Sequence, residues 1–142
     1  MNHPVLFVSI SFLRSLKGVK KDAEPEGQHS EIILHFSQYM LANMYYFGNY
    51  FIDKNYRKAA KWYLKAAQQG EYKAQFAISE MYYYGEGVKQ DYFKSVKWGK
   101  IAAENGDLQA QHNLAISYYK GIGILQDYIK AYAWANVAAA QG

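Results

Sequence analysis

Apolar and small residues recur in the second half of the chain at spacings of three and four, which is the period of a helix that buries one face. Between residues 74 and 84, Ala74, Ile78 and Met81 share such a face with Tyr82. The run Gly85-Glu86-Gly87 follows, and glycine tolerates the positive φ that ends helices and turns chains. The pattern predicts one helix that ends in a glycine-rich turn.

A second helical pattern follows this turn and ends at Gly106. Asp91 stands at its start, where an aspartate is a favoured N-cap, and Ser95, Trp98 and Ala102 share the face that we expect to be buried. Gly106 suits the position just after a helix. Residues 74–106 are therefore predicted to form a helical hairpin, with Trp98 in its core and a cost of about 3–5 kcal/mol for Trp98→Ala.

This hairpin pattern occurs three times at an interval of 36 residues, which indicates an array of stacked units. Units two and three match closely, whereas unit one begins at about Ser37, has one extra loop residue and lacks the second loop glycine. We expect the turn of unit one to be looser and differently shaped. The matching positions include Trp62, Trp98 and Trp134; Gly70, Gly106 and Gly142; Tyr56, Tyr92 and Tyr128; Lys58, Lys94 and Lys130; and Asn55, Asp91 and Asp127.

The shared motif, A-x-x-x-L-[GAS]-x-x-Y-x-x-G-x-G-V-x-x-D-x-x-x-A-x-x-W-x-x-x-A-A-x-x-G, resembles the SEL-1-like repeat, a relative of the tetratricopeptide repeat. The resemblance covers residues 37–142 and implies an all-α fold, an α-solenoid of about three helix-turn-helix repeats at 37–70, 74–106 and 110–142. Residues 1–36 are expected to be an irregular segment or linker with room for one short helix. Proteins with these repeats are mostly adaptors and scaffolds that bind another protein.

Composition narrows the functional classes further. The chain has no cysteine, so it offers neither a disulfide framework nor a thiolate metal site, unlike secreted members of the family whose repeats are joined by cysteine pairs. The basic residues behind the net charge of +4 cluster on the second helices of the first two hairpins, where a solvated outer face is the favoured interpretation. Binding to nucleic acid or to an acidic membrane surface is the alternative, without a recognised motif in its favour.

The two ends of the chain carry separate expectations. The apolar run at residues 5–13 is too short to span a bilayer and lacks the preceding positive charge of a signal peptide. We expect a cytoplasmic protein, with export to the periplasm or beyond as the alternative. Because Gly142 closes a repeat without a polar capping helix, the last hairpin should leave an apolar end. Either the chain is a piece of a longer protein, which we favour, or another chain covers that end, for instance by self-association.

No constellation of residues points to catalysis. The four histidines show no ligand spacing, and the glycine-rich turns follow helices rather than the strands of a dinucleotide site. Asp91 and Asp127 are better explained as helix caps than as acids or bases. We therefore expect no catalytic residue, no metal and no cofactor. An enzyme acting on cell-wall or β-lactam substrates remains a distant third hypothesis.

Tyrosine is unusually common, with 15 residues against 7 phenylalanines and 3 tryptophans. The tetratricopeptide geometry implied by the resemblance places much of this excess in a concave groove along the first helices, and tyrosine is enriched at protein interfaces. The alternative is that the rings pack between repeats. The predicted groove residues are Tyr39, Asn43, Tyr46, Phe47, Lys73, Phe76, Glu80, Tyr83, Tyr84, His112, Tyr119 and Lys120, together with Phe36, Gln109 and Ile116.

These observations predict a non-catalytic module that binds a peptide or protein partner in its tyrosine-rich groove. Bacterial proteins of this type resemble regulators, host-interaction factors or immunity proteins paired with a toxin. The alternative function is structural, with these repeats serving as a spacer in a longer solenoid.

Overall fold

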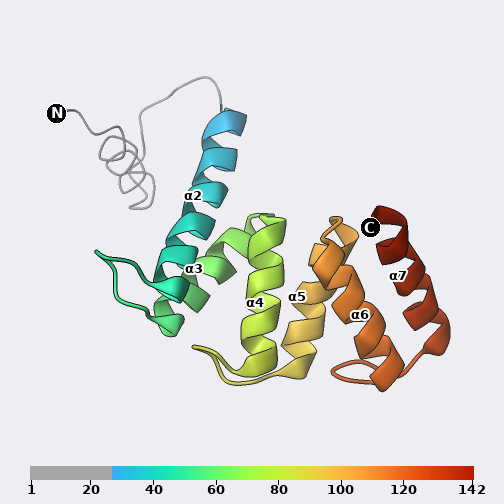
Figure 1. Cartoon of the computed structure of the whole chain (residues 1–142). Helices are drawn as coiled ribbons and strands as arrows, with labels where there is room; N and C mark the ends of the chain where they lie inside the picture. The colour runs from blue at the N-terminus through green and yellow to red at the C-terminus, as the bar shows by residue number, and fades with distance from the viewer. Residues whose placement is uncertain (1–26) are drawn as a thin grey trace.

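The computed structural model describes residues 27–142, which form six α-helices and no strand. The helices stand in a row as three hairpins (Figure 1). Their bounds are α2 Gly27–Phe47, α3 Tyr56–Gln68, α4 Tyr72–Tyr84, α5 Tyr92–Glu104, α6 Leu108–Lys120 and α7 Tyr128–Gln141. The predicted all-α solenoid is confirmed. The apolar run at residues 5–13 and most of the predicted linker lie outside the described residues.

Helix contacts follow the order of the chain. Each first helix packs against its own second helix, as α2 does with α3, α4 with α5 and α6 with α7. The hairpins are joined by contacts of α3 with α4 and of α5 with α6. Each repeat is therefore held by the contact between its own two helices and by its immediate neighbours, as in other solenoids.

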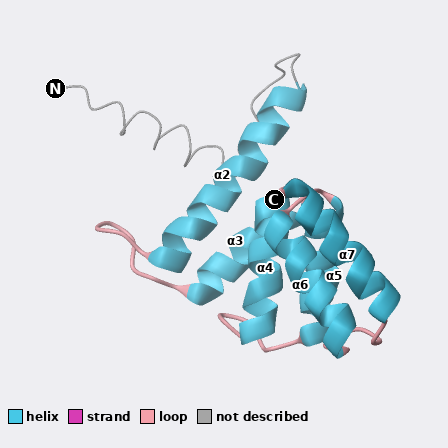
Figure 2. Ribbon diagram, turned by 45° about the vertical axis from the view of Figure 1, so that its right-hand side comes forward, coloured by secondary structure: helices cyan, strands magenta, loops and turns pink. Residues whose placement is uncertain are grey.

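The first helix begins before the predicted start of the repeat at about Ser37, because α2 already begins at Gly27. The repeat motif marks where the hairpin packs, and the helix continues beyond it towards the N-terminus. Figure 2 shows this longer helix projecting past the hairpin that it forms with α3. The extension has little to cover it, since Ile32 is 65% and Ile33 59% exposed.

The predicted helix caps are confirmed. The side chains of Asn55, Asp91 and Asp127 accept hydrogen bonds of 3.0 Å from the backbone amides three residues on. Each thereby satisfies an amide that the first turn of a helix leaves without an intrahelical partner. Glu71 and Asp107 cap α4 and α6 in a similar way.

The turns differ between repeats as the sequence predicts. In the second and third turns, the second glycine lies against the backbone of the preceding repeat, and a Cβ built on Gly87 would meet the Tyr56 carbonyl oxygen at 2.2 Å. Gly123 stands in the same relation to Tyr92. The first turn has no such contact, and the Asn49 side chain shapes it by accepting from the amides of Phe51 and Ile52.

The core consists mainly of small residues with a few larger side chains such as Ile78 and Met81, and the tryptophans lie outside it. Ala59, Ala66 and Ala102 have no exposed surface, which lets the paired helices approach closely. Trp98 is only half-buried and packs against the edge of the core. The prediction that Trp98 fills the core is therefore wrong, and the full core penalty expected of Trp98→Ala does not apply. The close approach of the helices at these alanines leaves the indole at the edge of the core.

Candidate binding groove

Three hollows lie along the first helices, one beside each repeat. The first lies between α2 and α4, over Tyr63 of α3, with a volume of about 440 Å³. The second lies between α4 and α6, over α5, with about 270 Å³. The third, of about 610 Å³, is bordered by α6 and α7 and is open on its other side. We call the three together the groove.

The structure places all twelve residues of the predicted binding site on these hollows. The first hollow takes Tyr39, Asn43, Tyr46, Phe47, Lys73, Phe76 and Glu80. The second takes Tyr83, Tyr84 and Lys120, with Phe76 and Glu80 on its border as well, and the third takes His112, Tyr119 and Lys120. Of the three further groove candidates, Ile116 lines the second and third hollows, whereas Phe36 and Gln109 line none. The binding role of these residues stays a prediction.

The first hollow is aromatic and is held by hydrogen bonds between distant residues. The Tyr63 hydroxyl donates to Asn43 Oδ1 and joins the hollow's floor to its wall on α2. The Tyr46 hydroxyl donates to Glu86 Oε2 at 2.7 Å, which ties the end of α2 to the turn of the next repeat. This bond and burial raise the pKa of Tyr46 above its ordinary value, so the ring stays a neutral donor.

Carboxylates give the groove a local negative charge. Burial raises the pKa of Glu80, and the nearby carboxylates of Glu86 and Asp107 raise it further. Within residues 27–142, none of these three forms an ion pair with a basic side chain. These three carboxylates therefore gather without an ion pair, in hollows that Lys73 and Lys120 also line.

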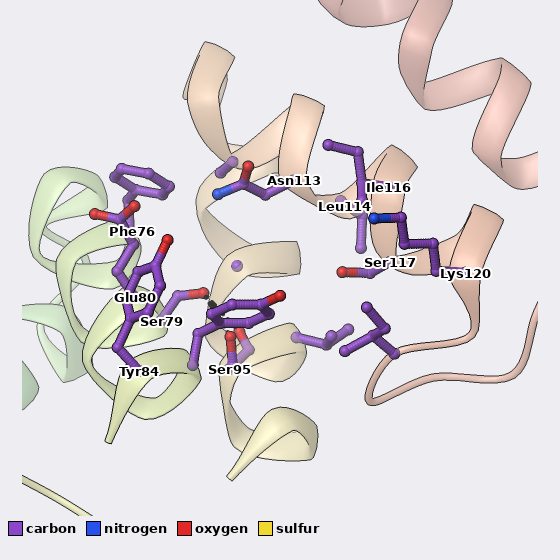
Figure 3. A pocket seen from close by; sticks show the side chains of 15 residues that line it. Phe76, Ser79, Glu80, Tyr84, Ser95, Asn113, Leu114, Ile116, Ser117 and Lys120 are labelled. Atoms are coloured by element: carbon purple, nitrogen blue, oxygen red, sulfur yellow. Dashed lines mark hydrogen bonds between the residues drawn. The ribbon is translucent and has the colours of Figure 1, made fainter. Parts of the chain in front are cut away.

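In the second hollow, two first helices face each other across a floor of small residues. Figure 3 shows Phe76 and Glu80 on the α4 side, with Ile116 and Lys120 on the α6 side. On the floor, Ser79 Oγ donates to the Ser95 carbonyl oxygen at 2.7 Å. A Cβ at Gly99 would lie 2.9 Å from Ser79 Oγ, so glycine allows this close approach.

The groove aromatics fall into two groups. Tyr46 packs on Tyr56 with ring centroids 5.0 Å apart, and Tyr83 packs on Tyr92 at 5.1 Å. For these rings, packing within the protein is confirmed as at least part of their role. The second group is available to a partner, since Phe47 is 70%, Tyr84 63% and Tyr119 60% exposed. These exposed rings also contact a ring of the protein at one edge, Phe47 with Tyr46 and Tyr84 with Tyr83 at 5.0 Å, and Tyr119 with Tyr128 at 5.5 Å.

Sequence reasoning missed four residues of the first hollow and its border: Tyr63, Ala77, Glu86 and Asp107. A signal for Tyr63 was present, because Gly99 and Ala135 hold its place in the other repeats and a large ring there is the exception. No local pattern marks Glu86, whose bond to Tyr46 spans 40 residues. Asp107 is recognisable as a helix cap, but its place beside Glu80 depends on the stacking of two repeats.

The repeated lysines take part in packing within each hairpin. Lys58, Lys94 and Lys130 each place their Nζ 5.2–5.6 Å from a tyrosine ring centroid of the first helix, within the range of a cation–π contact. These contacts support the interpretation of the lysines as a solvated structural face.

The part of the chain that the structure describes has neither a metal-binding cluster nor a membrane-spanning helix. Its His, Asp and Glu residues form no group of three that could hold a metal ion. None of its helices is long and apolar enough to cross a membrane.

Comparison with known families identifies the repeat. The Sel1 repeat family model matches three times, at residues 35–71, 73–107 and 108–142, close to the predicted units. No curated protein sequence matches the chain.

Solved structures agree with this assignment. A Sel1 repeat protein from Oxalobacter formigenes is 36% identical over 76% of this chain and 80% of its own, with a TM-score of 0.71. The protein c5321, a protective antigen of uropathogenic Escherichia coli with an SLR fold, is 28% identical, with a TM-score of 0.75. The match to c5321 covers 99% of this chain but 34% of that protein. Helicobacter pylori cysteine rich protein B, at 19% identity and a TM-score of 0.64, shares the fold.

Proposed function

The chain belongs to the Sel1 repeat family, and on this premise we propose that its groove holds an extended segment of a partner protein. Sel1 repeat proteins generally mediate protein–protein interaction and are typically non-catalytic scaffolds. The observation that carries the proposal is the set of exposed rings, Phe47, Tyr84 and Tyr119, each on the border of a hollow. Such rings offer large contact areas at little entropic cost.

The unpaired carboxylates around Glu80 favour a partner segment with a lysine or arginine. Glu80 borders both the first and the second hollow, and a cation beside it would compensate the carboxylates of Glu80, Glu86 and Asp107. The ring of Phe76 lines the same two hollows and would add cation–π attraction. Complementary charge of this kind contributes mainly to specificity and to the rate of association.

The proposal includes a bacterial setting, in which the partner belongs to a regulatory, host-interaction or toxin–immunity system. The bacterial origin of the similar structures supports this setting. The second candidate function is a spacer within a longer solenoid. It is favoured by the match to c5321, in which a chain of this length spans about a third of the protein.

An affinity pull-down from the native cell tests the proposed function with two variants, both checked for folding by circular dichroism. The test variant replaces Phe47, Tyr84 and Tyr119 by alanine, because these rings are exposed and their loss should leave the fold intact. The control is Phe93→Ala, whose ring is 72% exposed on α5 and lines none of the hollows. We expect a partner that binds wild type and Phe93→Ala but not the triple variant. A partner retained by the triple variant would favour the spacer function or another surface.

A further inference from the structure

The last hairpin exposes a face that the first two hairpins bury. Ala60 and Val96 are 4% and 9% exposed, whereas Tyr132, at the same place in the third repeat, is 72% exposed. The same contrast separates Ala67 and Ala103, both 2% exposed, from the exposed Ala139. In the first two repeats, the next first helix covers these positions, through the contacts of α3 with α4 and of α5 with α6.

The third hollow has the lining of a seat for one more helix. The second hollow is lined by eight residues of α4 and α5, which lie opposite α6. Each of these eight residues has a counterpart 36 positions later in the lining of the third hollow. Ser79, Val96 and Gly99 thus correspond to Ala115, Tyr132 and Ala135. The third hollow therefore continues an interface that the chain already uses internally.

The complementary half of this interface is exposed at the other end of the described chain. On α2, Met40 occupies the place of Ala77 and Asn113, both of which line hollows shared with the preceding repeat. Met40 is 37% exposed, and Phe36 and Ile33, on the same side of the helix, are 51% and 59% exposed. This apolar stripe matches the third hollow in its apolar character.

A buried glutamine marks the same relation between repeats. Gln75 Nε2 donates to the Ala67 carbonyl oxygen at 3.2 Å, and Gln111 Nε2 donates to that of Ala103 at 3.1 Å. Gln38 holds this position in the first repeat, where it is 1% exposed, and across the described residues its Nε2 makes no hydrogen bond. By the repeat register, the Nε2 of Gln38 would donate to a carbonyl oxygen of a preceding hairpin, at the position that Ala139 holds in the third repeat.

We propose that two copies of this chain stack head to tail, with α2 of one copy seated in the third hollow of the other. Met40 and Phe36 then bury apolar surface against Tyr132 and Ala135, and Gln38 Nε2 donates to the Ala139 carbonyl oxygen. Because the two faces differ, the contact is heterologous and leaves one free copy of each face at the ends of the assembly.

Sedimentation of the full chain over a roughly hundredfold range of concentration tests the proposal. The average mass of the wild type should rise with concentration from the monomer mass of 16.3 kDa towards twice that value and beyond. Tyr132→Lys should remain monomeric, and so should Met40→Lys, because each blocks one face. The matched control is Ala133→Lys on the same helix, since Lys61 and Lys97 hold that position in the other repeats. It should associate like wild type.

A mixture of the two blocked variants makes the test specific for head-to-tail stacking. Tyr132→Lys keeps an intact α2 face and Met40→Lys keeps an intact third hollow, so mixing them should restore a one-to-one dimer that stops growing. A monomeric wild type at every concentration would overturn the proposal, and so would a mixture that stays monomeric. Circular dichroism of each variant confirms that loss of association is not loss of folding.

Discussion

At the scale of single residues, the glycines of this chain have two different structural roles. Gly70 has φ +96° and open space around the position of a Cβ, so glycine is favoured there only because of its backbone conformation. Gly87 has φ +69° and in addition lies against the backbone of Tyr56 in the preceding repeat. The second glycine of the turn is therefore a packing residue between repeats.

Gly87→Ala should lower the free energy of unfolding by at least about 3 kcal/mol, because it adds a backbone clash to the strain of a positive φ. Gly70→Ala carries the strain alone and should cost about 1 kcal/mol. Urea denaturation of both variants measures the difference. Equal costs would show that the turn can move away from Tyr56 without loss.

The raised pKa of Glu80 predicts that the stability of the fold depends on pH. Burial and two neighbouring carboxylates raise its pKa in the folded state above the unfolded value, so the fold favours the protonated form. Its contribution to stability is then full below the unfolded pKa of about 4.3 and is lost as pH rises through the higher folded pKa. At neutral pH the ionised side chain destabilises the fold.

Glu80→Gln should therefore melt at a higher temperature than wild type at pH 7, and this advantage should shrink as the pH falls towards 4. Thermal melts followed by circular dichroism across this range measure it. The control is Glu104→Gln on α5, an exposed residue paired loosely with Lys100. A Glu80→Gln variant without a pH-dependent difference would contradict the proposed burial of this carboxylate.

At the scale of helices, the second helix of each hairpin depends on one side chain at its start. Asp91 accepts from the amide of Lys94 at 3.0 Å, and its carboxylate lies 3.7 Å from the Lys94 ammonium. The exposed ion pair adds little to stability, so the cap is the dominant effect.

Asp91→Ala should reduce stability by about 1 kcal/mol, and Asp91→Asn, which keeps an acceptor, should cost less. Asp53→Ala is the matched control, because this exposed aspartate lies in the first turn and caps no helix. Chemical denaturation distinguishes the three variants. Equal stabilities of Asp91→Ala and Asp53→Ala would show that the cap contributes nothing.

Helix positions were the easiest feature to predict from the sequence, because the interval of 36 residues transfers one pattern to three places. Caps, turns and the lining of the hollows all follow from that register. The start of α2 did not, since no cap residue precedes it within the motif and the helix extends past its packed part. The place of Trp98 and the bond from Tyr46 to Glu86 depend on the fit of neighbouring helices, which a repeat pattern does not encode.

At the scale of the whole molecule, burial is uneven along the row of hairpins. Each of α3, α4, α5 and α6 has five buried residues, whereas α7 has only Ala131 and Ala138. Because each hairpin contacts only its neighbours, α7 lacks the second contact that supports α3 and α5. Local opening should therefore begin at α7.

Hydrogen exchange measures this directly. In dilute protein, the amides of α7 should exchange faster than those of α5, whose helix is covered on both sides. In concentrated wild type, head-to-tail stacking should slow exchange in α7 and leave α5 nearly unchanged. Tyr132→Lys should show fast α7 exchange at both concentrations, because the seat for α2 is blocked. If α7 of dilute wild type is as protected as α5, the exposed face of the last hairpin is not a weak end of the solenoid.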